Sequence, residues 1–301
     1  MTNLHADYAK LKEKYKKLKS VFTNNGAYYI DKNDQVDIVY KNKSLIHRVQ
    51  SKYQKIEVFT HDFFGNILVI DDDLQLTQHD ESIYHEMITH VPLNYLENAK
   101  KVLIIGGGDC GTLTEVTKHS NVEEILMIEI DPEVVNTSVR YFKELTQGLY
   151  DKRTNLIFAD GAKWMRDNLE SYRKYFDVII IDSTDYSTAM SLFTDKFYKN
   201  ISVVLRDRGI FCFNCMSISW ESEYMKHVYK QMFKCFKYVN LYQAFIPTYA
   251  SGHYAFCVCS NNIDPINTPI NFSAFEKKKI PCKYYNKSIH LSSFNLPNEY
   301  Q

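Results

Sequence analysis

Residues 102–111, which read VLIIGGGDCG, are the feature that most constrains the fold of this chain. Four apolar residues run directly into three glycines, and helix-compatible residues follow from Thr112 to His119. A buried parallel strand that turns tightly into a helix has this pattern. Because such turns hold nucleotides, flavins and S-adenosyl compounds, the sequence predicts a ligand site here.

Asp109 narrows the class of ligand. It puts a negative charge where a dinucleotide-binding protein would seat a pyrophosphate against the N-terminus of the helix. Two like charges about 4 Å apart repel by roughly 4 kcal/mol at an effective dielectric constant of about 20. We therefore expect a cationic ligand at this turn and not a phosphate-bearing one.

The composition sets the number of domains and the kind of partner. With 301 residues, 45% of them hydrophobic and 24% charged, the chain is long enough for one large domain and a smaller one. The 36 basic and 36 acidic residues cancel, so no overall charge favours nucleic acid or membrane lipid, and we expect small-molecule partners. No apolar run is long enough for a membrane span or a signal peptide, which favours a cytoplasmic location.

The seven cysteines are an odd number and fall mostly in predicted strands, which is typical of reduced thiols. Cys212 and Cys215 have the spacing of half a zinc site. They lie, however, in a predicted buried strand, where neighbouring side chains alternate between faces. We therefore expect no metal ion.

Three segments follow one another along the chain. Apolar residues recur at helical spacing among lysines from Leu4 to Phe22, which predicts an amphipathic helix within an arm of residues 1–26. This arm would pack on the body or on a second subunit, or would lie as a basic helix on a membrane surface. Residues 27–95 predict a small antiparallel β domain plus a connecting helix at 81–90, which Pro92 would end. The predicted strands of this domain are 28–30, 36–40, 51–60 and 66–77, with a hairpin at 64–66.

Residues 96–301 predict a catalytic domain of the Rossmann-like α/β class. Strands and helices alternate there, which is typical of a parallel sheet with helices on both faces. Asp131 and Pro132 predict the start of a helix, and Gly209 is a plausible helix C-cap. The predicted strands are 102–105, 125–130, 155–158, 177–181 and 210–215, followed by a late antiparallel strand at 254–259. The predicted helices are 131–143, 196–205 and 222–236.

Acidic residues follow the predicted parallel strands. In open α/β sheets the ligand binds outside the carboxyl ends of the strands, so these side chains should meet in one cleft. Such a set would repel itself unless the usual occupant is positive, which favours a sulfonium nucleoside beside a polyamine. The acids are Asp109, Glu129, Asp160, Asp182 and Asp185.

Two of these acids suit a nucleoside. Glu129 stands 20 residues after Asp109, where a carboxylate accepts hydrogen bonds from ribose hydroxyls. Asp160 suits the exocyclic amine of adenine, although Asp160 followed by Gly161 is also ordinary turn chemistry.

Several motifs together resemble the aminopropyltransferase family, the spermidine and spermine synthases. The resemblance extends from about Ser51 to Pro297, with the motifs in family order. They are Gln54 within SKYQKIEVF, then LQLTQHDESIYHEMITHVPL, GGGDCG, MIEID, the strand end DST-D, IPTYASG and KYYNKSIHLSSFNLP.

The resemblance implies transfer of an aminopropyl group from decarboxylated S-adenosylmethionine to a polyamine, with methylthioadenosine released. Putrescine, giving spermidine, is the first expectation for the acceptor. A sulfonium is already a good leaving group, so the chemistry needs only an unprotonated amine held in line and one base. Decarboxylated S-adenosylmethionine is then a co-substrate, and no metal and no permanently bound cofactor is expected. The family also implies a homodimer.

The resemblance also implies roles for individual residues. Asp182 would accept the proton of the attacking amine, with Tyr84 holding its nitrogen. Asp109 would bind the ammonium group of the donor and repel the carboxylate of ordinary S-adenosylmethionine. The nucleoside would be bound by Gln54, Glu129, Asp160 and Gly161, and the polyamine slot would be lined by His85, Asp185 and Tyr249.

Three departures from the family pattern leave alternatives open. Cys110 replaces a glycine of the turn, residues 186–189 form a shortened loop, and no acid precedes Trp220 at the far end of the slot. A spermine-type enzyme that uses spermidine and a catalytically weak binding or regulatory subunit therefore remain alternatives. So does an N-methyltransferase, against which Asp109 argues.

Overall fold

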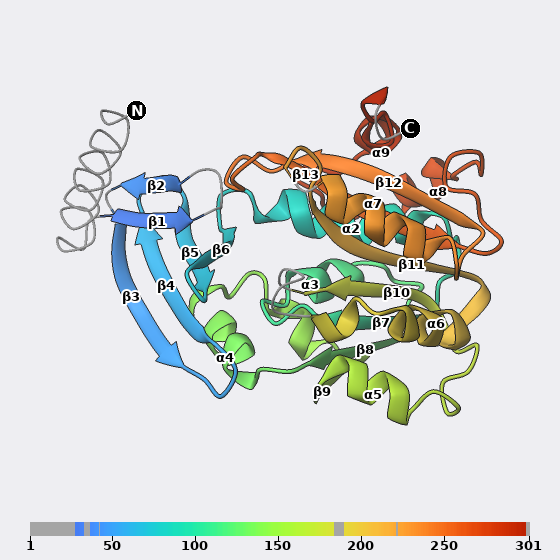
Figure 1. Cartoon of the computed structure of the whole chain (residues 1–301), viewed down its shortest axis with the longest axis horizontal. Coiled ribbons are helices and arrows are strands. Elements are labelled where there is room, and N and C mark those ends of the chain that lie inside the picture. The colour runs from blue at the N-terminus through green and yellow to red at the C-terminus, as the bar shows by residue number, and fades with distance from the viewer. Residues whose placement is uncertain (1–27, 33–36, 42, 184–189, 221, 299–301) are drawn as a thin grey trace, which may run out of the picture. The chain divides into compact units, whose positions relative to one another are not determined.

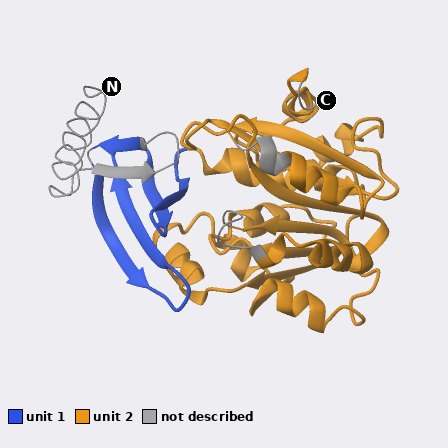
Figure 2. Cartoon of the chain, in the orientation of Figure 1, with its two compact units in different colours: residues 1–79 blue, residues 80–301 orange. Residues whose placement is uncertain are grey.

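The chain forms two compact units, Met1–His79 and Asp80–Gln301 (Figure 2). The computed structural model describes residues 28–32, 37–41, 43–183, 190–220 and 222–298. The amphipathic helix expected between Leu4 and Phe22 lies outside the described residues. Within the described part, no helix is both long and apolar enough to span a membrane.

The first unit is antiparallel, as the sequence predicts. Its four-stranded sheet has the order β3-β4-β5-β6, and a separate two-stranded sheet pairs β1 with β2. The bounds are β1 (Tyr28–Lys32), β2 (Asp37–Lys41), β3 (Lys43–Gln50), β4 (Lys55–His61), β5 (Gly65–Ile70) and β6 (Asp73–Thr77).

One strand prediction for this unit is wrong, and one strand was not predicted. The predicted strand at 66–77 is a hairpin, because Asp71 and Asp72 have φ of 50° and 72° and form a two-residue turn between β5 and β6. An Asp-Asp pair is not the usual signal for such a turn. Strand β3 was not predicted, since it lies at the sheet edge with mostly exposed side chains and has no apolar alternation.

The second unit is the predicted α/β fold (Figure 1). Its seven-stranded sheet has the order β12-β13-β11-β10-β7-β8-β9. The five strands from β11 to β9 are parallel, whereas β13 is antiparallel to both β11 and β12. The strands are β7 (Lys101–Gly106), β8 (Glu124–Glu129), β9 (Thr154–Phe158), β10 (Phe176–Asp182), β11 (Leu205–Ser217), β12 (Tyr238–Phe245) and β13 (His253–Ser260). The helices are α2 (Glu81–Asn94), α3 (Gly111–Thr117), α4 (Pro132–Tyr141), α5 (Gly161–Asp167), α6 (Asp195–Val204), α7 (Ser222–Met232), α8 (Phe272–Lys277) and α9 (Lys287–Ser293), with short turns η1 (Gln147–Tyr150) and η2 (Met190–Leu192).

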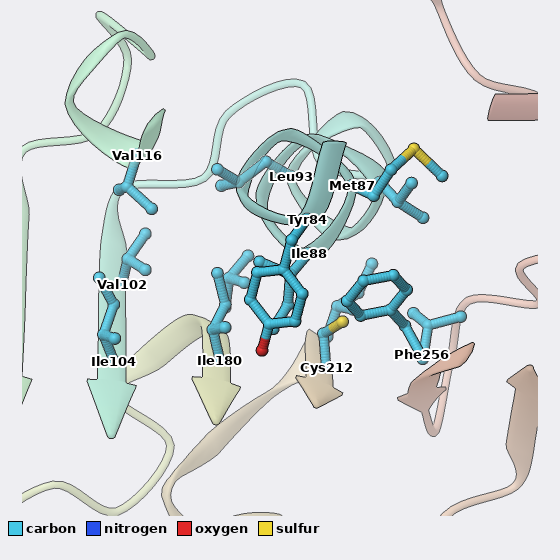
Figure 3. Close-up of a cluster of buried hydrophobic side chains, with 14 of the residues drawn as sticks. Tyr84, Met87, Ile88, Leu93, Val102, Ile104, Val116, Ile180, Cys212 and Phe256 are labelled. Carbon is cyan, nitrogen blue, oxygen red and sulfur yellow. The ribbon is translucent and has the colours of Figure 1, made fainter. Parts of the chain in front are cut away.

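Each central strand buries side chains on both faces, which explains the continuous apolar runs in the sequence. On one face, Ile104 of β7 and Ile180 of β10 pack against helices α2 and α3 (Figure 3). On the other face, Ile105 and Ile181 belong to the cluster that includes α5, α6 and α7. The same alternation separates Cys212 from Cys215, which belong to opposite clusters and cannot share a metal ion.

Several boundaries in the second unit differ from the sequence predictions. Helix α2 continues past Pro92 to Asn94 because burial of almost every residue holds its last turn. It belongs to the second unit, whereas the sequence grouping placed it with the β domain. Gly209 lies inside β11 and is not a helix C-cap. Strand β12 and helices α5, α8 and α9 were not predicted.

Glu86 fastens helix α2 to the C-terminal segment. Its side chain is buried, at 1% exposure, and its carboxylate accepts the backbone N–H groups of Lys283, Tyr284 and Tyr285 at 2.6, 2.8 and 2.6 Å. Three donors to one buried charge compensate its desolvation. Helix α2 is thereby fixed over the sheet.

Replacing Glu86 with glutamine should therefore destabilise the fold. The amide would place its own N–H group against a backbone donor, and we expect the free energy of unfolding to fall by about 3 kcal/mol. Denaturant unfolding measures this change, with the exposed Glu276→Gln on α8 as a matched control that should change it by less than about 0.5 kcal/mol. Equal effects of both substitutions would contradict this role for Glu86.

Candidate active site

The carboxyl ends of β7 and β10 meet at the point where the strand order reverses, where open α/β sheets bind ligands. Gly106 has φ of 85°, and a Cβ atom there would lie 2.1 Å from the carbonyl oxygen of Asp182. The N–H group of Gly107 donates to that same oxygen at 2.6 Å. Glycine thus lets the turn pass against β10, which brings Asp109 and Asp182 together at the carboxyl ends of the central strands.

Asp182 is buried, at 8% exposure, and both carboxylate oxygens accept a hydroxyl hydrogen bond. Tyr84 donates to Oδ1 at 2.7 Å and Thr112 donates to Oδ2 at 2.6 Å. In Figure 3 the Tyr84 hydroxyl points toward the carboxyl ends of the strands, which the arrowheads mark. Burial, with the nearby Asp109 charge, raises the pKa of Asp182, and His85 and the two hydroxyls only partly oppose it. Such a carboxyl group is suited to take up a proton.

Tyr84 keeps its own proton. Burial, together with the Asp182 charge, raises the pKa of Tyr84 well above its ordinary value. The ring lies 5.3 Å from Phe256 and 6.0 Å from Tyr254, measured between centroids. The phenol is therefore a rigid donor and not a base.

Asp109 is half-buried, and its Oδ1 atom accepts the N–H group of Gly111 at 2.7 Å. The same oxygen lies 3.2 Å from Nε2 of His85. Burial raises the pKa of Asp109, but the His85 charge and these contacts outweigh it, so the net pKa is lowered. Asp109 is therefore an ionised carboxylate in the turn between β7 and α3.

His85 is almost completely buried, at 2% exposure. The family resemblance implies a place in the polyamine slot, but both of its ring nitrogens face carboxylates of the protein. Its Nδ1 atom lies 2.8 Å from Oε2 of Glu81, and its Nε2 atom faces Asp109. The imidazole thus lies between Glu81 and Asp109.

Glu129 ends β8 and is buried, at 6% exposure. Its Oε1 atom accepts the N–H group of Asp131 at 2.8 Å, and a Cβ atom on Gly108 would lie 3.1 Å from Oε2. The glycine turn therefore passes alongside this carboxylate. Burial raises the pKa of Glu129 to about 7.

Asp160 is exposed and forms the N-cap of α5, where it accepts the N–H group of Lys163 at 2.9 Å. The structure thus shows the capping role, and a contact with adenine stays a prediction. A Cβ atom on Gly161 would lie 2.4 Å from Cγ2 of Ile105, so the start of α5 packs closely on β7.

Of the three remaining predicted residues, one lies beside Tyr84, one belongs to the first unit and one lies outside the described residues. Tyr249 is half-buried, and its ring lies 6.3 Å from that of Tyr84 and 4.9 Å from that of Tyr254. Gln54 belongs to the first unit, in the turn between β3 and β4. Asp185 lies outside the described residues.

Three residues that contact the site residues or their neighbours were not predicted. Glu81 precedes His85 by one helical turn, and that i, i+4 spacing is the signal that could have identified it. Thr112 follows the glycine turn and was interpreted only as part of a helix. Asn214 donates through Nδ2 to the carbonyl of Ser183 at 3.0 Å, and no sequence pattern indicates this contact.

Cys110, at the position where the family has glycine, has φ of 70° and is fully buried. Its side chain packs into the apolar cluster that contains Leu113. The left-handed conformation explains why glycine suits this position, and a non-glycine residue there costs about 1 kcal/mol.

A metal ion is not needed to explain the group. Among the residues that the structure describes, His85, Asp109 and Asp182 have ligand atoms within 4.8 Å of one another. The Asp182 oxygens already accept from Tyr84 and Thr112, and Asp109 already pairs with His85. Groups of the protein therefore already hold both carboxylates in place.

Comparisons with known domain families match most of the chain. Residues 81–269 match the spermine/spermidine synthase domain, and residues 27–78 match the spermidine synthase tetramerisation domain. A polyamine aminopropyltransferase of Thermotoga petrophila is 38% identical over 275 residues, covering 90% of each chain. One from Clostridioides difficile is 41% identical over 251 residues, covering 82% of this chain and 87% of its own.

Solved structures agree with these matches. A spermidine synthase in complex with the transition-state analogue AdoDATO has a TM-score of 0.86 at 35% identity, covering 90% of this chain and 92% of its own. The spermidine synthase of Thermotoga maritima has a TM-score of 0.85 at 36% identity, with the same coverage.

The buried Glu129 predicts a dependence of stability on pH. Its pKa is 4.5 when unshifted and about 7 in the fold. The folded state therefore binds more protons between these values, and stability is lost as pH rises through that window. Glu129→Gln should raise the free energy of unfolding by up to about 3 kcal/mol above pH 7 and by nothing below pH of about 4.5. Denaturant unfolding across this range measures the gain, and a gain independent of pH would contradict the assignment.

Proposed function

The chain belongs to the spermine/spermidine synthase family, and from this membership and the site geometry we propose that it is a polyamine aminopropyltransferase. It would transfer the aminopropyl group of decarboxylated S-adenosylmethionine to a polyamine. The observation that carries the proposal is the buried Asp182, bound by Tyr84 and Thr112 and close to Asp109. Such a site favours cationic ligands and contains a proton acceptor.

The reaction is a displacement at carbon. The lone pair of the acceptor amine attacks the propyl carbon next to the sulfonium; a C–N bond forms, the C–S bond breaks and its electrons neutralise the sulfur. Methylthioadenosine leaves and the new secondary amine stays protonated, so the one proton released overall is the one that the acceptor ammonium loses before it attacks. Because the sulfonium is already a good leaving group, no general acid is required.

Asp182 is the proposed proton acceptor. An aliphatic amine has a pKa of about 10, so it arrives as an ammonium and must lose a proton before it can attack. A carboxylate first binds that cation and then takes its proton. The hydrogen bonds from Tyr84 and Thr112 hold Asp182 in one orientation, so the amine is presented in line.

The donor would be held at both of its ends. Asp109 would bind the ammonium of the aminopropyl group and repel the carboxylate that ordinary S-adenosylmethionine carries. Glu129 would accept hydrogen bonds from the ribose, and Asp160, Gly161 and Gln54 would bind the remainder of the nucleoside.

The acceptor slot is proposed beside Tyr84, with Tyr249 and Asp185 lining it. Putrescine, giving spermidine, is the first candidate acceptor, and spermidine is the second. His85 would act on the site through Asp109, which it contacts. A binding or regulatory subunit without turnover is the remaining alternative.

The assembly and location are also proposals. A segment that matches a tetramerisation domain supports an oligomer, which could be the expected homodimer or a larger assembly. A cytoplasmic location stays a prediction.

Product analysis tests the proposed function. The purified chain should form methylthioadenosine from decarboxylated S-adenosylmethionine with putrescine and, more slowly, with spermidine. If neither polyamine gives methylthioadenosine, the enzymatic proposal is contradicted and the binding or regulatory subunit is the remaining function. Faster turnover with spermidine would identify the spermine-type enzyme.

The variant Asp182→Asn tests whether Asp182 is the proton acceptor. It keeps the shape and an acceptor oxygen but cannot take the proton, so kcat should fall by roughly 100-fold or more. Binding of methylthioadenosine should be nearly unchanged. Unchanged turnover would remove Asp182 from this role.

A further inference from the structure

Glu81 has no role in the proposed reaction, yet it is the carboxylate closest to His85 on the side away from Asp109. We propose that Glu81 is a positioning residue that keeps the His85 imidazole doubly protonated, and that this imidazolium fixes Asp109 as the receptor for the donor's ammonium group. The identity of the donor rests on the proposed function. The protonation of His85 does not.

The geometry requires two ring N–H groups. The His85 Nδ1 atom lies 2.8 Å from Oε2 of Glu81, and its Nε2 atom lies 3.2 Å from Oδ1 of Asp109. A neutral imidazole carries one N–H group and one lone pair, so one of the two carboxylates would face a lone pair. Only the imidazolium donates to both.

The groups that face His85 from the surrounding elements have mostly negative charge. Glu81 faces it from its own helix, Asp109 from the turn before α3, and Asp182 from the end of β10. Lys283 lies 3.7 Å from the other oxygen of Glu81 and does not face the ring. Burial alone would lower the pKa of His85, but the Asp109 and Glu81 carboxylates outweigh it and raise the pKa well above its ordinary value.

The backbone supports this arrangement. A Cβ atom on Gly111 would lie 2.3 Å from Cε1 of His85, so the ring fits only because residue 111 is glycine. The N–H group of Gly111 donates to Oδ1 of Asp109 at 2.7 Å, the same oxygen that faces His85. Two donors on one oxygen fix the rotation of the Asp109 carboxylate, and within the described part of the chain this leaves Oδ2 to accept from a ligand.

Removal of the Glu81 charge should therefore act on the donor end of the site. Glu81→Gln keeps the size of the side chain and can still accept from Nδ1, but it no longer stabilises the positive ring. When His85 loses its proton, Asp109 keeps at most a neutral hydrogen bond and is less well oriented. The imidazolium that opposes the raised pKa of Asp182 is lost as well.

Nitrogen NMR of the ligand-free, full-length protein tests the protonation state. With histidine ring nitrogens labelled, and His85 assigned by its absence in His85→Gln, both of its nitrogens should have imidazolium shifts at neutral pH. In Glu81→Gln the pKa of His85 should fall by about one unit or more. A neutral His85 in the unmodified protein, or an unchanged titration in Glu81→Gln, would overturn the proposal. This result does not depend on whether aminopropyl transfer is detected.

Calorimetry tests the positioning role. Glu81→Gln should weaken the binding of decarboxylated S-adenosylmethionine about tenfold, which is about 1.4 kcal/mol. It should change the binding of methylthioadenosine, which lacks the ammonium, by less than about twofold. Equal losses for both ligands would indicate a merely structural role, and no loss for either would also overturn the proposal.

A matched control removes a charge from the other end of the parallel strands, where they begin. Glu123 precedes β8, its side chain is 64% exposed and it pairs with Lys100. Glu123→Gln changes the net charge by the same amount, and it should leave the His85 titration and both affinities unchanged. An equal effect of this control would assign the result to net charge and contradict the role of Glu81.

Discussion

The buried carboxylate of Asp182 is the constraint on which the rest of the site depends. Removal of a carboxylate from water is costly unless hydrogen bonds or an opposite charge compensate it. The two hydroxyl donors, Tyr84 and Thr112, compensate part of that cost. Asp109 adds negative charge nearby, and His85 is the cation that the described residues bring to this group. On the proposed function, a positively charged ligand would supply the remaining compensation.

The fold provides this arrangement through a few rigid contacts. Gly106 lets the turn after β7 pass against the end of β10, which brings Asp109 to Asp182. Helix α2 carries Glu81 and, one turn later, Tyr84 and His85, and the buried Glu86 holds this helix to the C-terminal segment. The side chains that contact the reacting groups are therefore set by the sheet and by one anchored helix.

The elements that the sequence predicted correctly are those with a local signal, either an apolar run or a capping residue. The parallel strands and Asp131 as a helix N-cap are confirmed, because apolar runs and capping residues are local signals. The turn at Asp71 and the edge strand β3 lack such signals and were missed. The site was predicted as a set of acids with Tyr84, His85 and Tyr249. Thr112 was missed because its contact depends on three-dimensional proximity, whereas the helical spacing of Glu81 and His85 is a local signal that was not used. Asp160 was predicted correctly as a strand-end acid, but only the structure shows that it caps α5.

Proton release on polyamine binding tests the central electrostatic claim most directly. Calorimetric titration of putrescine and spermidine in buffers of different ionisation enthalpy counts the protons exchanged. Since burial raises the pKa of Asp182, an ammonium that binds there should displace a proton from it, increasingly as the pH is lowered from neutral. The account predicts proton release that disappears in Asp182→Asn. Binding without proton release, or with equal release in the variant, would contradict it.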